Sequence, residues 1–202
     1  MTLVGLDFDN TLVSYDLLFK KLALEKNLID ESVAAEKKAI RDHLHSKGQD
    51  EQFTLLQGEV YGKRIEDAEP ADGMLETLRT VQSIGIDLVL ISHKTKVPYV
   101  GPSYDLHNAA KCWLTKHGFF SKAGLAWKED QVFFEGSAND KISRIMEIGC
   151  NYFIDDLPEI LISLPNSIKG ILYDPRYVNC KEWDCRINNW RELLGMSEFN
   201  KK

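Results

Sequence analysis

The apolar positions of the chain follow two different spacings. The run from Leu3 to Phe8 is short, mostly apolar and followed at once by polar residues, which is typical of a buried β-strand. From Asp16 to about Gly62 the apolar residues instead recur every three or four positions, which predicts helices and no convincing strand. The helices expected in this block begin at Asp16, Glu31 and Asp50.

Strands and helices alternate over the rest of the chain. Short apolar runs predict strands, and runs with helical periodicity, one of them opened by Ser103, predict helices between them. Such alternation predicts a parallel sheet covered on both faces, so the expected fold class is a doubly wound α/β core. The expected strands are residues 86–91, 131–135, 151–155 and 168–173, and the expected helices are residues 73–83, 103–117, 139–148, 157–164 and, as a closing helix, 183–195.

Length and charge limit the classes of function. The 202 residues allow one core domain and a modest insertion. A net charge of −6 without a basic run argues against nucleic acid as a partner. No apolar stretch approaches the ~20 residues of a membrane helix, and the first ten residues do not have the pattern of a signal peptide. We therefore expect a cytoplasmic protein with no membrane partner.

The four cysteines do not predict a metal site. A chain of this length does not need disulfides, so reduced thiols are expected. Cys180 and Cys185 have no second Cys or His pair close by, which argues against zinc.

Polar residues follow three of the predicted strands. Asp7 and Asp9 end the first strand, Ser92 follows the strand at Ile91, and Asp155 and Asp156 end a later one. In doubly wound sheets ligands bind outside the carboxyl ends of the strands, so these side chains should converge. Clustered carboxylates raise each other's pKa and normally need a cation, and an oxygen-rich site without histidine suits Mg²⁺.

These residues supply what phosphoryl transfer to a carboxylate requires. Asp7 would attack the phosphorus atom, and Asp9 would serve as general acid and then as general base. Lys141 would neutralise the phosphate together with Mg²⁺, and Ser92 would donate a hydrogen bond to it.

The same residues resemble the motifs of the haloacid dehalogenase-like hydrolases. The segment LVGLDFDNTLV is similar to the family's first motif, an apolar strand followed by Asp-x-Asp-x-Thr. DLVLIS resembles the second motif, and YFIDD resembles the fourth, a strand ending in paired acids. The presence of Asp9 favours a phosphatase over a true dehalogenase, which attacks carbon and does not need an acid at this place.

The resemblance assigns roles to individual residues. Asp7 corresponds to the nucleophile and metal ligand, and Asp9 to the acid/base, which also offers its backbone carbonyl to magnesium. Thr11 corresponds to the residue that steadies the turn. Asp156 corresponds to a metal contact, while Asp155 would orient Lys141 or a metal-bound water.

The third motif departs from the family pattern. Lys141 precedes Asp155 by 14 residues, whereas the family's lysine usually lies further upstream. A compact helix that leads directly into the strand makes the short spacing physically reasonable. Lys122 and Lys128 remain alternatives.

An insertion follows the first motif. The resemblance implies a core of residues 1–13 and 74–202 with a helical C1 cap at 14–73, a lid suited to a small phosphorylated metabolite. Asp16, His93 and Lys94 are candidates for contact with the substrate. The stretch ISHKTKVPYVGPSYDLHNAA is also similar to phosphatases of surface-carbohydrate biosynthesis, which suggests a sugar, polyol or amino-alcohol phosphate, itself free or sugar-linked.

Two other functions stay open. A phosphomutase would use the same aspartyl-phosphate and return the phosphate to its substrate. A non-catalytic binding or regulatory module could keep the fold without the reaction. The sequence also leaves open whether the protein is a monomer or a dimer.

Overall fold

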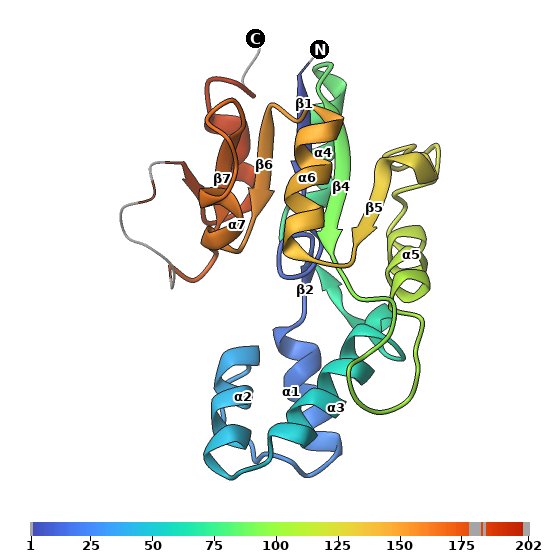
Figure 1. Cartoon of the computed structure of the whole chain (residues 1–202), viewed down its shortest axis with the longest axis vertical. Coiled ribbons are helices and arrows are strands. Elements are labelled where there is room, and N and C mark those ends of the chain that lie inside the picture. Colours follow the sequence, from blue (N-terminus) through green and yellow to red (C-terminus); the bar gives the residue numbers. More distant parts are fainter. Residues whose placement is uncertain (1, 178–182, 184, 200–202) are drawn as a thin grey trace. The chain divides into compact units, whose positions relative to one another are not determined.

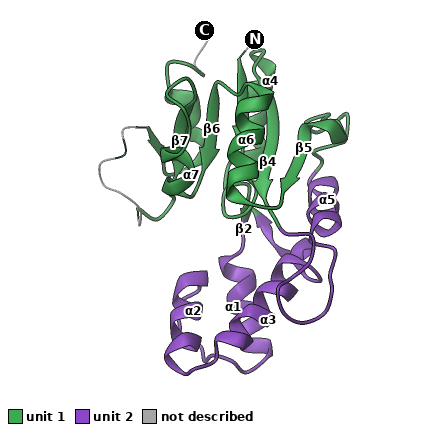
Figure 2. Cartoon of the chain, viewed as in Figure 1, with its two compact units in different colours: residues 1–13, 70–94, 118–202 green, residues 14–69, 95–117 purple. Residues whose placement is uncertain are grey.

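The computed structural model describes residues 2–177, 183 and 185–199. The chain divides into two compact units, shown in Figure 2. Unit 1 comprises residues 1–13, 70–94 and 118–202, and unit 2 comprises residues 14–69 and 95–117. Each unit is therefore built from more than one segment of the sequence.

Unit 1 contains a parallel sheet in the order β5-β4-β1-β6-β7-β8. This sheet confirms the predicted α/β fold class. In Figure 1, α6 and α7 lie in front of the strands and α4 lies behind them. The strands are β1 (Leu3–Leu6), β4 (Asp87–His93), β5 (Val132–Glu135), β6 (Tyr152–Asp155), β7 (Lys169–Tyr173) and β8 (Arg186–Ile187), and the α-helices are α4 (Met74–Ser83), α6 (Ala138–Ile148) and α7 (Pro158–Ile162).

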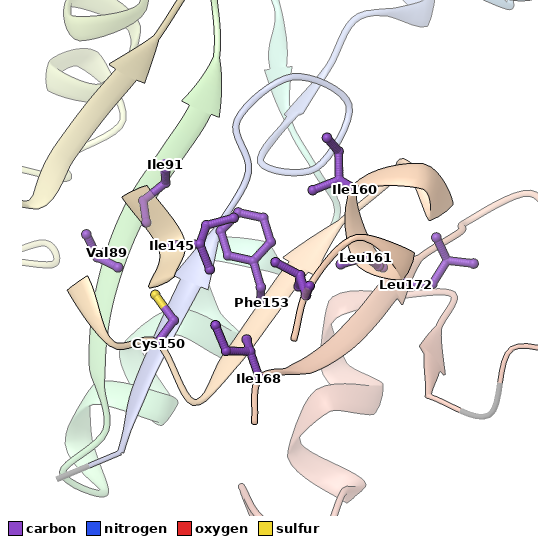
Figure 3. Packing of buried hydrophobic residues seen from close by; sticks show 10 residues of the cluster. Val89, Ile91, Ile145, Cys150, Phe153, Ile160, Leu161, Ile168 and Leu172 are labelled. Carbon is purple, nitrogen blue, oxygen red and sulfur yellow. The ribbon is translucent and has the colours of Figure 1, made fainter. Parts of the chain in front are cut away.

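The front face of the sheet is covered by one apolar cluster. Figure 3 shows Ile91 and Phe153 from the strands packed with Ile145 of α6 and Ile160 of α7. Gly5 of β1 permits this packing, because a Cβ atom there would lie 2.4 Å from the Phe153 ring. The cluster packs α6 and α7 against β4 and β6, whose carboxyl ends carry Ser92 and Asp155.

Unit 2 is a helical bundle closed by aromatic side chains. Its α-helices are α1 (Asp16–Glu25), α2 (Lys37–Ser46), α3 (Asp50–Tyr61) and α5 (Leu106–Lys116), with a short 3-10 helix η1 (Ile65–Asp67). The ring of Phe19 stacks on Phe53 with centroids 5.9 Å apart and meets Tyr61 edge-on at 5.8 Å. Burial of these rings holds α1 against α3.

The segment from 95 to 117 belongs to this helical unit. Cβ atoms built on Gly58 of α3 and on Gly62, the residue that follows α3, would lie 3.1 Å from Pro98 and 2.6 Å from Tyr104. Trp113 of α5 donates a hydrogen bond of 2.8 Å to the carbonyl of Ala68. The units thus differ from the predicted boundaries: residues 95–117 lie in unit 2 and residues 70–73 in unit 1.

Two short strands, β2 (Val13–Ser14) and β3 (Glu69–Pro70), pair with each other, and neither was predicted. They were missed because two-residue strands leave no periodic pattern to read.

Two predicted helices begin elsewhere, and a third is replaced by other elements. The helix expected from Glu31 begins at Lys37, because the residues before it form turns in which Ser32 binds the Asp30 carboxylate. The helix expected from Ser103 begins after Asp105, whose side chain accepts a hydrogen bond from the amide of Asn108. Over the described part of 183–195 the closing helix is absent: β8 and the 3-10 helix η3 (Trp190–Gly195) stand there instead.

Candidate active site

Asp7 lies directly after β1, the strand between β4 and β6. Its amide donates to the carbonyl of Ile154 at 2.9 Å, so its backbone extends the sheet. The residue is only 4% exposed. A buried carboxylate of this kind is stable only if other groups neutralise or hydrogen-bond it.

Lys141 neutralises Asp7 and Asp155 together. Its ammonium Nζ lies 2.6 Å from Oδ1 of Asp7 and 2.6 Å from Oδ2 of Asp155. The lysine is in the first turn of α6, which begins at the N-cap Ser137, and it is 1% exposed. Burial alone would lower the pKa of Lys141, but Asp7 and Asp155 outweigh it and raise the pKa. Lys141 is therefore a permanent positive charge beside Asp7.

Ser92 holds the same oxygen of Asp7. As the penultimate residue of β4, it is buried and donates from Oγ to Oδ1 of Asp7 at 3.0 Å. Among the residues that the structure describes, none donates a hydrogen bond to the other oxygen, Oδ2 of Asp7. Asp7 is thus fixed through one oxygen, and the second is available to react or to bind a cation.

Asp155 and Asp156 complete the acidic cluster at the end of β6. Carboxylate oxygens of Asp7, Asp155 and Asp156 lie within 4.8 Å of one another. Asp155 is buried and also accepts a hydrogen bond of 3.0 Å from the amide of Leu157. Burial, followed by repulsion from Asp7, raises the pKa of Asp155 to about 7, against the opposite effect of Lys141. Close carboxylates with oxygen donors alone are a set that fits Mg²⁺.

The turn after Asp7 carries Asp9 and Thr11. Asn10 between them adopts a positive φ of 58°, a conformation that asparagine tolerates better than most residues. Both oxygens of Asp9 accept hydrogen bonds from the ammonium of Lys94, at 2.9 and 2.8 Å. Thr11 is fully buried, and its hydroxyl has no hydrogen-bond partner within the described parts of the chain, while its carbonyl accepts from Trp190.

Asp16 and His93, the other two predicted substrate contacts, remain predictions. The carboxylate of Asp16, in unit 2, accepts a hydrogen bond of 2.8 Å from the amide of Lys37 and so caps α2. His93 ends β4 and is exposed. Lys122 and Lys128, the alternatives to Lys141, are exposed as well.

The pair between Lys94 and Asp9 was not predicted from the sequence. Residues two apart in a strand share one face, so Lys94 continues the side of β4 that presents Ser92. The two-residue spacing of Ser92 and Lys94 was therefore the signal in the sequence that Lys94 lies near the site. The partner of Lys94 could not be known without the turn that brings Asp9 to it.

No helix in the described part of the chain is long and apolar enough to cross a membrane. Cys180, one of the two cysteines weighed for zinc, lies outside the described residues.

Curated proteins with similar sequences carry the names of nucleotidases. The chain is 26% identical over 198 residues to a Bacillus cereus protein named "Putative nucleotidase", a match that covers 94% of each chain. It is 27% identical over 128 residues to "Putative nucleotidase OB0422" of Oceanobacillus iheyensis, covering 60% of this chain and 58% of the other. No protein-family model matches the chain.

Solved structures share the fold at low sequence identity. The HAD-hydrolase YfnB of Bacillus subtilis, described as bound to magnesium, matches with a TM-score of 0.61 and 14% identity over 96% of this chain and 97% of its own. A HAD family hydrolase of Deinococcus radiodurans, described with bound phosphate and sodium, matches with a TM-score of 0.58 and 12% identity over 99% and 96% of the two chains. The fold that the motifs at Asp7, Ser92 and Asp155 predicted is thereby confirmed: the chain shares it with solved structures described as HAD hydrolases.

Proposed function

We propose that the protein is a phosphomonoester hydrolase in which Asp7 accepts the phosphoryl group. The observation that carries the proposal is the ammonium of Lys141, held 2.6 Å from carboxylate oxygens of both Asp7 and Asp155. A buried carboxylate fixed at one oxygen and beside a permanent positive charge suits attack on an anionic phosphate.

Each step of the proposed reaction uses a residue at the end of β1. Oδ2 of Asp7 would bond to phosphorus while the bond from phosphorus to the ester oxygen breaks, and Asp9 would give a proton to that leaving oxygen. Water would then pass a proton to Asp9 and attack the phosphorus of the aspartyl phosphate, which releases inorganic phosphate and restores the Asp7 carboxylate.

Lys141 and Ser92 would stabilise the phosphate oxygens during transfer. Both now contact Oδ1 of Asp7, so a bound phosphate would lie against the same donors. Asp7, Asp156 and the backbone carbonyl of Asp9 would hold Mg²⁺, whose charge would stabilise the same oxygens. Asp155 keeps Lys141 in place, since its other oxygen is already bonded to Leu157.

The substrate would be a small phosphomonoester. The names of the two curated relatives favour a nucleoside monophosphate. The loop after Ser92, through its similarity to carbohydrate-pathway phosphatases, favours a sugar, polyol or amino-alcohol phosphate. Both classes present the same phosphate dianion to Asp7, and the carbon skeleton is what a substrate panel must distinguish.

Phosphate release from such a panel with Mg²⁺ tests the proposal. Asp7→Asn should lower kcat by at least about 10³-fold, because the amide cannot form the aspartyl phosphate. Reduction of the trapped intermediate by borohydride should convert Asp7 to homoserine in the wild type and not in Asp7→Asn. Activity that survives Asp7→Asn would overturn the mechanism, and interconversion of isomeric phosphates without phosphate release would indicate a mutase.

A further inference from the structure

Lys94 is anchored much more firmly than the carboxylate it binds. Its amide donates to the carbonyl of Glu135 at 2.9 Å, which extends the pairing of β4 with β5 beyond His93. Its side chain is 2% exposed, whereas that of Asp9 is 23% exposed. The ammonium also lies 5.3 Å from the centre of the Phe8 ring. Lys94 is therefore the fixed partner in the pair, and Asp9 is the one that solvent and ligands can reach.

The ion pair between Lys94 and Asp9 carries a desolvation cost. Burying an ammonium removes its hydration, and only close oxygen partners offset that loss. The two distances of 2.9 and 2.8 Å place both oxygens of Asp9 on one ammonium. Such a contact restrains both torsions of the aspartate side chain, because neither oxygen can turn away without losing a charged hydrogen bond.

Restraint of the Asp9 side chain would serve its proposed role as a general acid. It lies in a turn closed by hydrogen bonds from the amides of Leu12 and Val13 to the carbonyl of Phe8. The backbone is thus fixed while the side chain points to partly accessible space. A general acid must reach within about 3 Å of the proton's destination, so a freely rotating carboxyl would spend little time in the right place.

We infer that Lys94 is a positioning residue for Asp9, and this inference rests on the proposed function of Asp9 as general acid and base. Lys94 holds the carboxyl in the orientation from which it exchanges a proton with the leaving oxygen and with water. The assignment differs from a substrate contact, because a lysine that bound phosphate directly would act on every phosphoester alike.

Leaving groups separate the two roles. An alkyl phosphate needs a proton on its leaving oxygen, whereas p-nitrophenyl phosphate releases a stable phenolate without one. Because the second step, in which water attacks the aspartyl phosphate, is the same for every ester, kcat/KM is compared, which covers only the steps up to departure of the leaving group. Lys94→Met, which keeps the stem and removes the charge, should lower kcat/KM for an alkyl phosphate by about 10²-fold. It should lower kcat/KM for p-nitrophenyl phosphate by less than about threefold. Asp9→Asn should show the same selectivity, and the double variant should lose little more than either one.

Controls keep structural damage apart from positioning. Lys96→Met removes an exposed lysine two residues further along and should leave both rates unchanged. Lys94→Arg keeps a positive charge and should restore part of the alkyl phosphate rate; if Lys94→Met does not fold, Lys94→Arg measured against the same ester series replaces it. Equal losses of kcat/KM for all esters would overturn the positioning role and leave the phosphatase proposal intact. A wild type inactive on every ester would overturn both.

Discussion

Two regions of the molecule are each built around a lysine ammonium enclosed by oxygen atoms, and they differ in the kind of oxygen. In unit 1, Lys141 binds the carboxylates of Asp7 and Asp155. In unit 2, Lys20 binds the backbone carbonyls of Asp30, Glu31 and Val33 at 3.0, 3.0 and 2.6 Å. The exposed carboxylate of Glu31 lies further away, at 3.8 Å from the same ammonium. Carbonyl oxygens satisfy the ammonium without reactivity, whereas carboxylates can attack phosphorus and bind a cation.

The two lysines also differ in burial, and this separates a structural role from a chemical one. Lys20 remains 13% exposed in its side chain and holds the turn between α1 and α2. Lys141 is 2% exposed, and both of its partners are buried. Unit 1 thus concentrates charge where water cannot screen it, and this is the condition under which electrostatic interactions are strongest.

Removing Lys141 should have the largest effect. Lys141→Met leaves Asp7 and Asp155 buried without their cation, so the free energy of unfolding should fall by about 3–5 kcal/mol. Phosphatase activity should be lost as well. Urea unfolding measures the first and phosphate release the second, with Lys122→Met, at an exposed site in the same unit, as the control. A loss of stability below about 1 kcal/mol would show that the two carboxylates do not depend on Lys141.

Removing Lys20 should have a smaller and purely structural effect. Lys20→Met leaves three carbonyls without their charged donor, which should cost about 1–3 kcal/mol in unit 2. Hydrogen exchange of amides in α1 to α3 measures the change. Lys21→Met, at a side chain that is 56% exposed, should change it by less than about 0.5 kcal/mol. If Lys20→Met and Lys21→Met had equal effects, the contacts of Lys20 with the three carbonyls would not stabilise unit 2.

Asp16 tests whether unit 2 contributes to substrate binding or only to structure. If Asp16 only caps α2, Asp16→Ala should lower the free energy of unfolding by about 1 kcal/mol. Asp16→Asn keeps an acceptor for the amide of Lys37 and should lower it by less. If Asp16 contacts the substrate, both variants should lower kcat/KM, without this difference in stability. Thermal unfolding and steady-state kinetics on the same samples separate the two roles.

The smallest effect is expected at the surface pair of His45 and Asp50, whose ring nitrogen and carboxylate are 2.5 Å apart. Hydrogen bonding to Asp50 and its charge raise the pKa of His45. The stabilisation that His45 contributes is therefore fully present below its unfolded pKa, about 6.5, and is lost as the pH rises through the folded value. An NMR titration should place the His45 midpoint above that of an unperturbed histidine, and Asp50→Asn should return it; an unchanged midpoint would contradict the pairing.

Much of the core was predictable because its signals are local. Five of the strands in the main sheet and the helices between them follow from apolar runs in the sequence. β8 was not predictable, because two residues carry no periodicity. The prediction of a closing helix was wrong. The 3-10 helix η3 begins there at the buried Trp190, whose ring nitrogen donates a hydrogen bond to the carbonyl of Thr11, a contact that the local sequence does not reveal. The packing of residues 95–117 in the helical unit depends on their close approach to Gly58 and Gly62, which the periodicity of apolar residues does not predict.

The sequence by itself determined which strands end in Asp7, Ser92 and Asp155, because apolar runs and the polar residues after them are local features. It also determined, through those motifs, the fold that the chain shares with solved HAD hydrolases. Only the tertiary structure decided that Lys141 lies between two carboxylates and that Lys94 holds Asp9. Both are contacts between segments far apart in the chain, 134 residues for Lys141 with Asp7 and 85 for Lys94 with Asp9. Their geometry depends on how strands and turns pack, which no local pattern encodes.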